Sequence, residues 1–146
     1  MSHFGNISSL EKKSTNIDLL TSADKESEAY IISKIQEQYP EHSILSEEQG
    51  ELNTGSEYLW VIDPLDGTTN FSHNLPIFAV SIALVHKGNK TLCGVVYNPA
   101  ADKCFYAEDN KGAFLDGITI KPTSSNTLSE SLLDTWYPYL HDSKYD

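Results

Sequence analysis

The chain has 146 residues, of which 39% are hydrophobic and 21% are charged, and these values are typical of one globular domain rather than of a disordered chain. Its net charge of −11 comes from 21 acidic residues against ten basic ones, all of them lysine, so the sequence offers neither a basic face for nucleic acid nor an arginine that could clamp phosphate. The longest apolar stretch, residues 77–85, is about half of the ~20 residues that a membrane-spanning helix needs, which argues against a transmembrane segment.

The first clear element along the chain is a helix predicted for residues 24–39. Ile31, Ile35 and Tyr39 recur every four residues there and form one apolar stripe. Pro40 should end the helix, because a residue that precedes proline avoids helical backbone angles.

A series of strands is predicted after this helix. The predicted strands cover residues 43–46, 58–63, 77–86, 91–97, 104–107, 113–115, 118–120 and 131–136. The strand at 58–63 should stop at Pro64, and the pair Asp116-Gly117 is a strong signal for a tight hairpin turn. One helix followed by a run of antiparallel strands predicts the α+β class.

The two cysteines are predicted to remain free thiols. A hairpin turn centred within residues 98–103 pairs Cys104 with about Tyr97, so Cys93 lies roughly four residues out of register with Cys104. Unpaired thiols favour a reducing compartment, and we therefore expect a cytoplasmic protein.

Carboxylates gather around one turn, directly after the strand at 58–63. Asp63 and Asp66 are the first and fourth residues of a turn through Pro64, so their side chains should lie within several ångströms and repel each other unless a cation or a proton lies between them. Oxygen ligands without histidine or cysteine select hard cations such as Mg²⁺ or Mn²⁺. Residues 67–70 can open a short helix whose N–H groups would face an anion. A cation site beside an anion site predicts phosphate chemistry.

Simpler interpretations exist for each residue taken alone. Asp66-Gly67 by itself is typical of a hairpin turn, Asp24 of a helix start, and Glu47-Glu48 of a solvated loop. Two other motifs fail on spacing: an EF-hand loop requires its glycine one position later, and a phosphatase with an aspartate nucleophile requires Asp where Pro64 stands. The five histidines lack the spacing of a zinc site.

The segment WVIDPLDGTTNF (residues 60–71) resembles the first signature of the inositol monophosphatase family. The segments DLLTSAD (18–24) and YPEHSILSEE (39–48) resemble two further family motifs, and GVVYNP (94–99) and KGAF (111–114) also fit. The resemblance runs from about residue 12 to residue 137, and the twelve-residue signature is highly specific.

The resemblance implies roles for individual residues. Mg²⁺, with Mn²⁺ as a substitute, would be held by Glu47, Asp63, Asp66 and the backbone carbonyl of Leu65. The substrate phosphate would contact the N–H groups of Gly67 and Thr68 and lie against Glu47, Leu65 and Asp66. Asp24 and Thr68 would orient and deprotonate the attacking water, with Glu47 as a further catalytic group. Glu48 would support the ligands from behind, and Lys13 would lie near the metal site.

The family also carries a W-D-x-A-A-G segment that supplies a further metal ligand, and residues 124–146 do not match it. The resemblance therefore covers the N-terminal portion of the family. It implies that residues 1–146 form a single partial domain, the first α+β part of an α/β/α/β/α sandwich with the C-terminal half absent. The sheet should then expose an apolar face where the other half would pack.

The leading hypothesis is a Mg²⁺-dependent phosphomonoesterase that hydrolyses a small phosphorylated polyol of the inositol-1-phosphate class. The alternative is a catalytically silent metal-binding fragment, or one half of a split enzyme. Histidinol phosphate, sugar bisphosphates and 3′-phosphoadenosine phosphates are handled by relatives and stay open as substrates. The resemblance implies a homodimer, and the split-enzyme alternative implies a complementing C-terminal half as partner. The charge balance and the short apolar stretches predict no nucleic-acid partner and no membrane.

Overall fold

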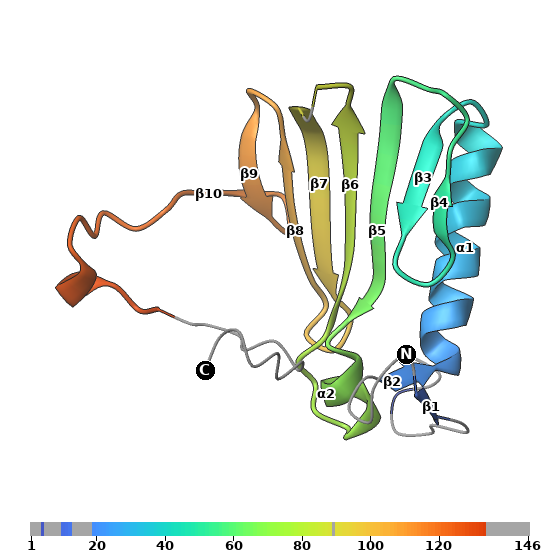
Figure 1. Cartoon of the computed structure of the whole chain (residues 1–146). Coiled ribbons are helices and arrows are strands. Elements are labelled where there is room, and N and C mark those ends of the chain that lie inside the picture. Colours follow the sequence, from blue (N-terminus) through green and yellow to red (C-terminus); the bar gives the residue numbers. More distant parts are fainter. Residues whose placement is uncertain (1–3, 5–9, 13–18, 89, 134–146) are drawn as a thin grey trace, which may run out of the picture.

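The computed structural model describes residue 4 and residues 10–12, 19–88 and 90–133 (Figure 1). Its strands are β1 (Leu10–Lys12), β2 (Leu19–Thr21), β3 (Ser43–Ser46), β4 (Gly50–Leu52), β5 (Tyr58–Asp66), β6 (Ala79–His86), β7 (Lys90–Asn98), β8 (Lys103–Glu108), β9 (Gly112–Leu115) and β10 (Ile118–Ile120). Its helices are α1 (Ser22–Gln38), α2 (Thr68–Ser72) and a 3₁₀ turn at Leu128–Glu130. Eight strands form one sheet in the order β10-β9-β8-β7-β6-β5-β3-β4, while β1 pairs with β2. The predicted α+β class is confirmed.

Helix α1 packs on one face of the sheet, against β3 and β5. Ile35 from the helix forms a buried cluster with Ile44 of β3 and Ile62 of β5, so the predicted apolar stripe does face the core. The helix begins two residues earlier than predicted and ends at Gln38, close to Pro40 as expected. Tyr39 lies past the helix end and stacks on His42, with ring centroids 5.0 Å apart.

The sheet is mixed, because β3 runs parallel to β5 while the other strand pairs of the described sheets are antiparallel. The prediction of purely antiparallel strands was therefore wrong for this pair. The cause is β4, a strand that the sequence did not predict: it pairs with β3 at the outer edge, so the chain returns to the far side of β3 before β5 begins. As a result β3 and β5 end at the same edge of the sheet, with Ser46 opposite Ile62.

Strand β5 continues to Asp66, although Pro64 was predicted to stop it at Asp63. Its pairing with β6 is interrupted between Asp63 and Asp66 and resumes where Asp66 lies opposite Ala79. Proline has no N–H to donate to the ladder, and an interruption of this kind is where a strand tolerates it. The two aspartates therefore bracket a bulge at the end of a strand rather than a free turn.

Three other expectations about the strands were incomplete or wrong. The strands β1, β2 and β4 were not predicted, because each spans three residues and is too short to show an alternating pattern. Strand β6 begins at Ala79, two residues later than predicted. The strand predicted at 131–136 is absent over residues 131–133, and residues 134–136 lie outside the described residues.

The β7–β8 hairpin has the predicted register. Tyr97 lies opposite Cys104, whereas Cys93 lies opposite Glu108, and both cysteines are free thiols. The prediction that no disulfide joins them is confirmed.

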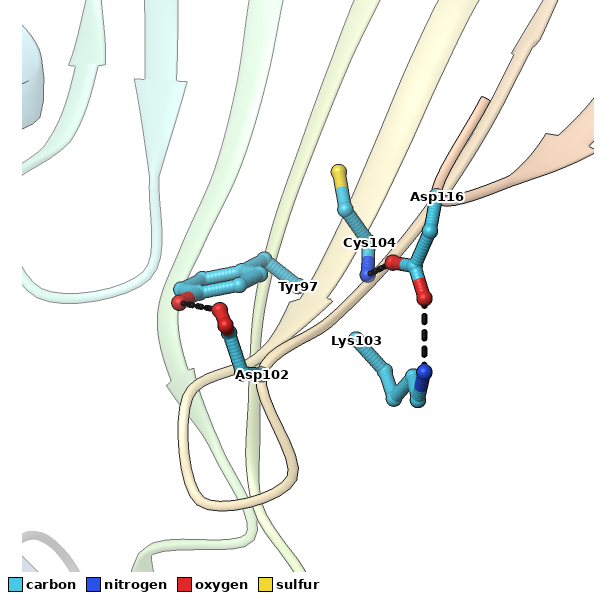
Figure 2. Close-up of polar contacts among 5 residues, drawn as sticks. All are labelled: Tyr97, Asp102, Lys103, Cys104 and Asp116. Atoms are coloured by element: carbon cyan, nitrogen blue, oxygen red, sulfur yellow. Dashed lines mark hydrogen bonds and ion pairs between the residues drawn. The ribbon is translucent and has the colours of Figure 1, made fainter. Parts of the chain in front are cut away.

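A cluster of polar contacts fastens the β9–β10 turn to the start of β8 (Figure 2). Asp116, in that turn, accepts a hydrogen bond from the Cys104 N–H at 2.9 Å. Its carboxylate also forms an ion pair with the Lys103 ammonium at 2.7 Å. The Cys104 N–H and the Lys103 ammonium hold the pKa of the Asp116 carboxyl below its ordinary value. At the other end of the β7–β8 hairpin loop, the Tyr97 hydroxyl donates to Asp102 at 2.9 Å, which raises the pKa of Tyr97.

The sheet face that α1 covers continues as an apolar row beyond the helix. Ile82, Val95, Tyr106 and Phe114 lie opposite one another across β6 to β9, in line with the buried Ile62. These four residues line a hollow on the sheet, and Tyr106 is 40% exposed. Within the described residues no helix covers this part of the sheet (Figure 1). Nor is any helix in the described part of the chain long and apolar enough to cross a membrane.

Candidate functional site

The predicted site residues that the structure describes meet at the edge of the sheet where β3 and β5 end and α2 begins, the lower end in Figure 1. Glu47 directly follows β3, and its N–H donates to the Ile62 carbonyl of β5 at 3.2 Å. This bond continues the parallel pairing of the two strands, so Glu47 and Asp63 come to lie side by side. The parallel register thus brings together two carboxylates that are 16 positions apart in the sequence.

The end of β5 is held in a fixed shape by hydrogen bonds. The Leu65 N–H donates to the Asp63 carboxylate at 3.1 Å, and the Ser27 hydroxyl of α1 donates to the Pro64 carbonyl at 2.9 Å. Leu65 is buried with Phe71 of α2, in a cluster that also includes Phe78. The backbone that presents the Leu65 carbonyl is therefore braced by both helices and by the strand itself.

Gly67 provides the sharp change of direction from β5 into α2. Its φ angle is +87°, in the left-handed region that glycine adopts without strain. A Cβ at this position would lie 2.9 Å from the Ile77 carbonyl oxygen, closer than real side chains come to backbone. The residue must therefore be glycine for Thr68 to follow the strand so closely.

Substitution of Gly67 by Ala should destabilise the chain by about 2–4 kcal/mol, the sum of a left-handed backbone cost and a backbone clash. Urea unfolding followed by circular dichroism measures this loss. As a control, Gly88→Ala changes another glycine with a positive φ angle, but with open space around its Cβ. It should cost only the backbone term, about 1–2 kcal/mol. Equal losses at the two positions would contradict the role given to the clash.

Asp24 of α1 and Thr68 of α2 form a pair at the same edge. Asp24 is fully buried, and the Thr68 hydroxyl lies 3.3 Å from one of its carboxylate oxygens and 3.1 Å from the Leu65 carbonyl. A hydroxyl beside a buried carboxylate can pass a proton to it, provided that the reacting water comes within hydrogen-bond reach. The pairing of Asp24 with Thr68 across 44 positions is the contact that the proposed water activation requires.

The carboxylates at this edge repel one another. Burial raises the pKa of Asp63 from 3.8 to about 6, with further contributions from the neighbouring charges of Glu47 and Asp66. Glu47 also shares a hydrogen bond with Asp63 that acts in the same direction. Glu47 and Asp66 are exposed, so a cation from solvent can reach this group. A cation there would relieve the repulsion that otherwise favours a proton.

The donor set fits Mg²⁺ by its chemistry: three carboxylates and one backbone carbonyl, all oxygen. The part of the chain that the structure describes contains no closed cluster of three or more His, Cys, Asp or Glu side chains around a single point. Mg²⁺ does not require one, because it keeps several waters and is held by one or two carboxylates together with substrate phosphate. The residues therefore fit an open magnesium site rather than a closed structural one.

The two predicted supporting residues have different outcomes. Glu48 is partly buried next to Glu47 in the chain, and its N–H donates to the Glu28 carboxylate at 3.1 Å. Lys13 lies outside the described residues. Glu28 was not among the predicted site residues, although its position four residues after Asp24 places it on the same face of α1. The available signal was its spacing of three and four positions from Ile31 and Ile32, which pack against the core.

Comparison with known proteins supports the resemblance seen in the sequence. The model of the inositol monophosphatase family matches residues 1–144. The chain belongs to the inositol monophosphatase family. Among curated relatives, the Nus factor SuhB of Escherichia coli K12 is 46% identical over 123 residues, which cover 84% of this chain and 46% of that protein. The inositol-1-monophosphatase of a Synechocystis species is 40% identical and covers 93% of this chain and 47% of that protein.

Solved structures of the inositol monophosphatase family share this fold. The IMPase of Thermotoga maritima superposes with a TM-score of 0.80 at 38% identity, over 85% of this chain and 48% of that one. An IMPase/NADP phosphatase complexed with Mg²⁺ and phosphate has a TM-score of 0.77 at 28% identity, over 85% of this chain and 47% of that one. The chain thus spans about half the length of the relatives that it matches.

Proposed function

We propose that this chain carries the metal-binding and phosphate-binding part of a Mg²⁺-dependent phosphomonoesterase that acts on a small phosphorylated polyol of the inositol-1-phosphate class. The observation that supports this most directly is the meeting of two groups at one sheet edge. Glu47, Asp63 and Asp66 offer oxygen ligands there, and the buried Asp24 meets the Thr68 hydroxyl beside them. Metal ligands beside a proton acceptor are the requirements of phosphate ester hydrolysis by water.

In the proposed mechanism the residues divide into metal ligands, phosphate contacts and a proton path. Glu47, Asp63, Asp66 and the Leu65 carbonyl hold the cation, while the N–H groups of Gly67 and Thr68 contact the phosphate oxygens. The Thr68 hydroxyl orients the attacking water, and Asp24 takes up its proton through that hydroxyl. Mg²⁺, when bound, supplies positive charge that activates water and neutralises phosphate, which matters in a chain without arginine.

Several finer points belong to the same proposal. Mn²⁺ should substitute for Mg²⁺, because it accepts the same oxygen ligands. The two free cysteines are consistent with a cytoplasmic location. The proposed partners are the phosphate ester and either a second copy of the chain or a complementing C-terminal half. The alternative is a fragment that binds metal without turnover.

The proposal is tested by phosphate release from inositol-1-phosphate, with and without Mg²⁺, and by calorimetric titration with Mn²⁺. Substitution of Asp66 by Asn should abolish Mg²⁺-dependent release and weaken Mn²⁺ binding at least ~100-fold, because it removes one charge and one ligand oxygen. Asp109→Asn is the matched control. It removes one charge where Asp109 pairs with Lys90, at the opposite end of the sheet.

Each outcome separates the candidates. Metal-dependent turnover that Asp66→Asn loses and Asp109→Asn keeps would support a phosphomonoesterase. Metal binding without turnover would support the metal-binding fragment or the split enzyme. Unchanged Mn²⁺ affinity in Asp66→Asn would contradict the assignment of the site. Histidinol phosphate, fructose-1,6-bisphosphate and 3′-phosphoadenosine 5′-phosphate, assayed in parallel, would show which ester class the site prefers.

A further inference from the structure

Glu28 is a buried carboxylate without a role in the proposed mechanism. It lies on α1, one turn after Asp24, and is 2% exposed. Its Oε1 atom accepts three hydrogen bonds: one from the Ser46 hydroxyl, one from the Glu48 N–H at 3.1 Å and one from the Gln49 N–H at 3.0 Å. All three donors belong to the segment that leads out of β3.

Packing alone does not call for a carboxylate at this position. Burial of a charged group is costly unless hydrogen bonds replace its water, whereas an apolar residue on this helix face would bury at no such cost. The neighbouring inward positions of α1 carry Ile31, Ile32 and Ile35, which pack in the core. Glu28 places a carboxylate among these apolar residues, and three donors converge on it, so its contribution lies in the segment that it holds.

What it holds is the backbone on both sides of Glu47. Ser46 precedes Glu47, Glu48 and Gln49 follow it, and the N–H of Glu47 itself donates to β5. The segment is therefore tied to α1 through Glu28 and to β5 through the strand pairing. With both ties in place, the direction in which Glu47 leaves the backbone is fixed relative to Asp63.

The same helix also fixes the other half of the site. Asp24 contacts Thr68 of α2, and Ser27 contacts the Pro64 carbonyl at the end of β5. Asp24, Ser27 and Glu28 lie on the same side of the first turns of α1. They contact α2, the end of β5 and the segment after β3, respectively. The helix acts as a rigid frame that sets the spacing between the Glu47 segment and the end of β5.

We propose that Glu28 is a positioning residue: its carboxylate anchors residues 46–49 and thereby aims Glu47 at the metal site. The proposal rests on the function proposed above for the metal ligands, but the anchoring itself can be measured without metal. Groups that orient metal ligands from behind change metal affinity by about 10- to 100-fold when they are removed.

Two substitutions of Glu28 and one control separate anchoring from general stability. Glu28→Leu removes the acceptor of three hydrogen bonds, so we expect Mn²⁺ affinity to fall at least ~10-fold. Because the donors of Ser46, Glu48 and Gln49 lose their partner, the midpoint of urea unfolding should fall as well. Glu28→Gln keeps one neutral acceptor oxygen, so it should restore part of the affinity. Gly88→Ala, which should also lose stability but away from the site, separates the two roles. It should keep the wild-type Mn²⁺ affinity if Glu28 positions Glu47, whereas an equal loss of affinity in Gly88→Ala would show that stability alone accounts for the effect.

Amide hydrogen exchange of the metal-free 146-residue chain, followed by NMR, gives a second readout. In Glu28→Leu the Glu48 and Gln49 amides should exchange at least ~10-fold faster than in the wild type, with β6 and β7 unchanged. Asp116→Asn is the matched control, because Asp116 also accepts a backbone N–H and a side-chain donor but lies in the β9–β10 turn (Figure 2). It should leave Mn²⁺ affinity and the exchange of Glu48 and Gln49 unchanged.

The outcomes distinguish this proposal from the proposed function. Unchanged exchange at Glu48 and Gln49 in Glu28→Leu would overturn the anchoring role, whatever the chain does with metal. Faster exchange together with Mn²⁺ affinity within threefold of wild type would overturn the link to the metal site. If the wild-type chain fails to bind Mn²⁺, the proposed function fails and the positioning of Glu47 for metal fails with it, whereas the exchange data still decide the anchor.

Discussion

Substitution of Asp24 by Asn should lower the rate of Mg²⁺-dependent phosphate release by about 10²- to 10⁴-fold, the range for loss of a general base. Asp24 is fully buried, and the Thr68 hydroxyl lies 3.3 Å from its carboxylate. Asn preserves the shape of the side chain and its acceptor oxygen but has no affinity for a proton. The rate should therefore fall far more than the Mn²⁺ affinity, which depends on Glu47, Asp63 and Asp66.

Variants of Thr68 test whether the proton passes through its hydroxyl. Thr68→Ser keeps the hydroxyl and should retain much of the rate, whereas Thr68→Val keeps the volume and should lose nearly as much as Asp24→Asn. The double variant Asp24→Asn with Thr68→Val should be little worse than either alone, because both remove the same step. Multiplicative losses would contradict a shared path for the proton, and a normal rate in Asp24→Asn would remove Asp24 from the mechanism.

The fold illustrates which parts of a structure a sequence determines locally. The apolar stripe that ends at Pro40 predicted α1, and alternation predicted β6, because both patterns lie within one element. The parallel pairing of β3 with β5 depends on β4, a three-residue strand whose pairing at the edge has no local signal. Pro64 led to a wrong prediction of where β5 ends. The pairing of β5 with β6 is interrupted at this position, so the strand can continue through the proline.

The candidate site divides in the same way. Asp63, Asp66 and Thr68 lie within six residues, so a single segment with its spacing could predict that they cluster. That Glu47 would lie beside Asp63 follows only from the parallel register, which the residues themselves did not predict; the resemblance to a family supplied it. Glu28 needed the structure, because neither its burial nor its three donors are written in the residues around it.

Asp63→Asn should have two opposite effects, which makes it the sharpest test of the carboxylate cluster. The variant should weaken Mn²⁺ binding at least ~100-fold, because it removes a charged ligand. Without metal, in EDTA at pH 8, it should be more stable than the wild type by about 1 kcal/mol. Asn can still accept the hydrogen bond from the Leu65 N–H, so the substitution removes the charge and leaves the local backbone contact in place.

The pH dependence fixes the sign of this second effect. Burial and the charges of Glu47 and Asp66 raise the pKa of folded Asp63 to about 6, against 3.8 for an ordinary aspartate. Between these values Asp63 binds more protons in the folded chain than in the unfolded chain, so its contribution to the free energy of unfolding falls as pH rises from about 4 to about 6 and is level above that. A fully buried shift of this size would be worth about 3 kcal/mol, and screening at this half-exposed position reduces it to about 1 kcal/mol.

Urea unfolding of both chains in EDTA at pH 5, 6, 7 and 8 measures the difference directly. The advantage of Asp63→Asn should grow from pH 5 to pH 7 and then stay constant, whereas Asp109→Asn, which loses a charge paired with Lys90, should give no such growth. If Asp63→Asn were less stable than the wild type at pH 8, the repulsion at this edge would not exist. If both results are obtained, Asp63 lowers the stability of the metal-free chain and raises its affinity for metal. The stability that Asp63 removes from the metal-free chain is then part of what makes this edge of the sheet a site for a cation.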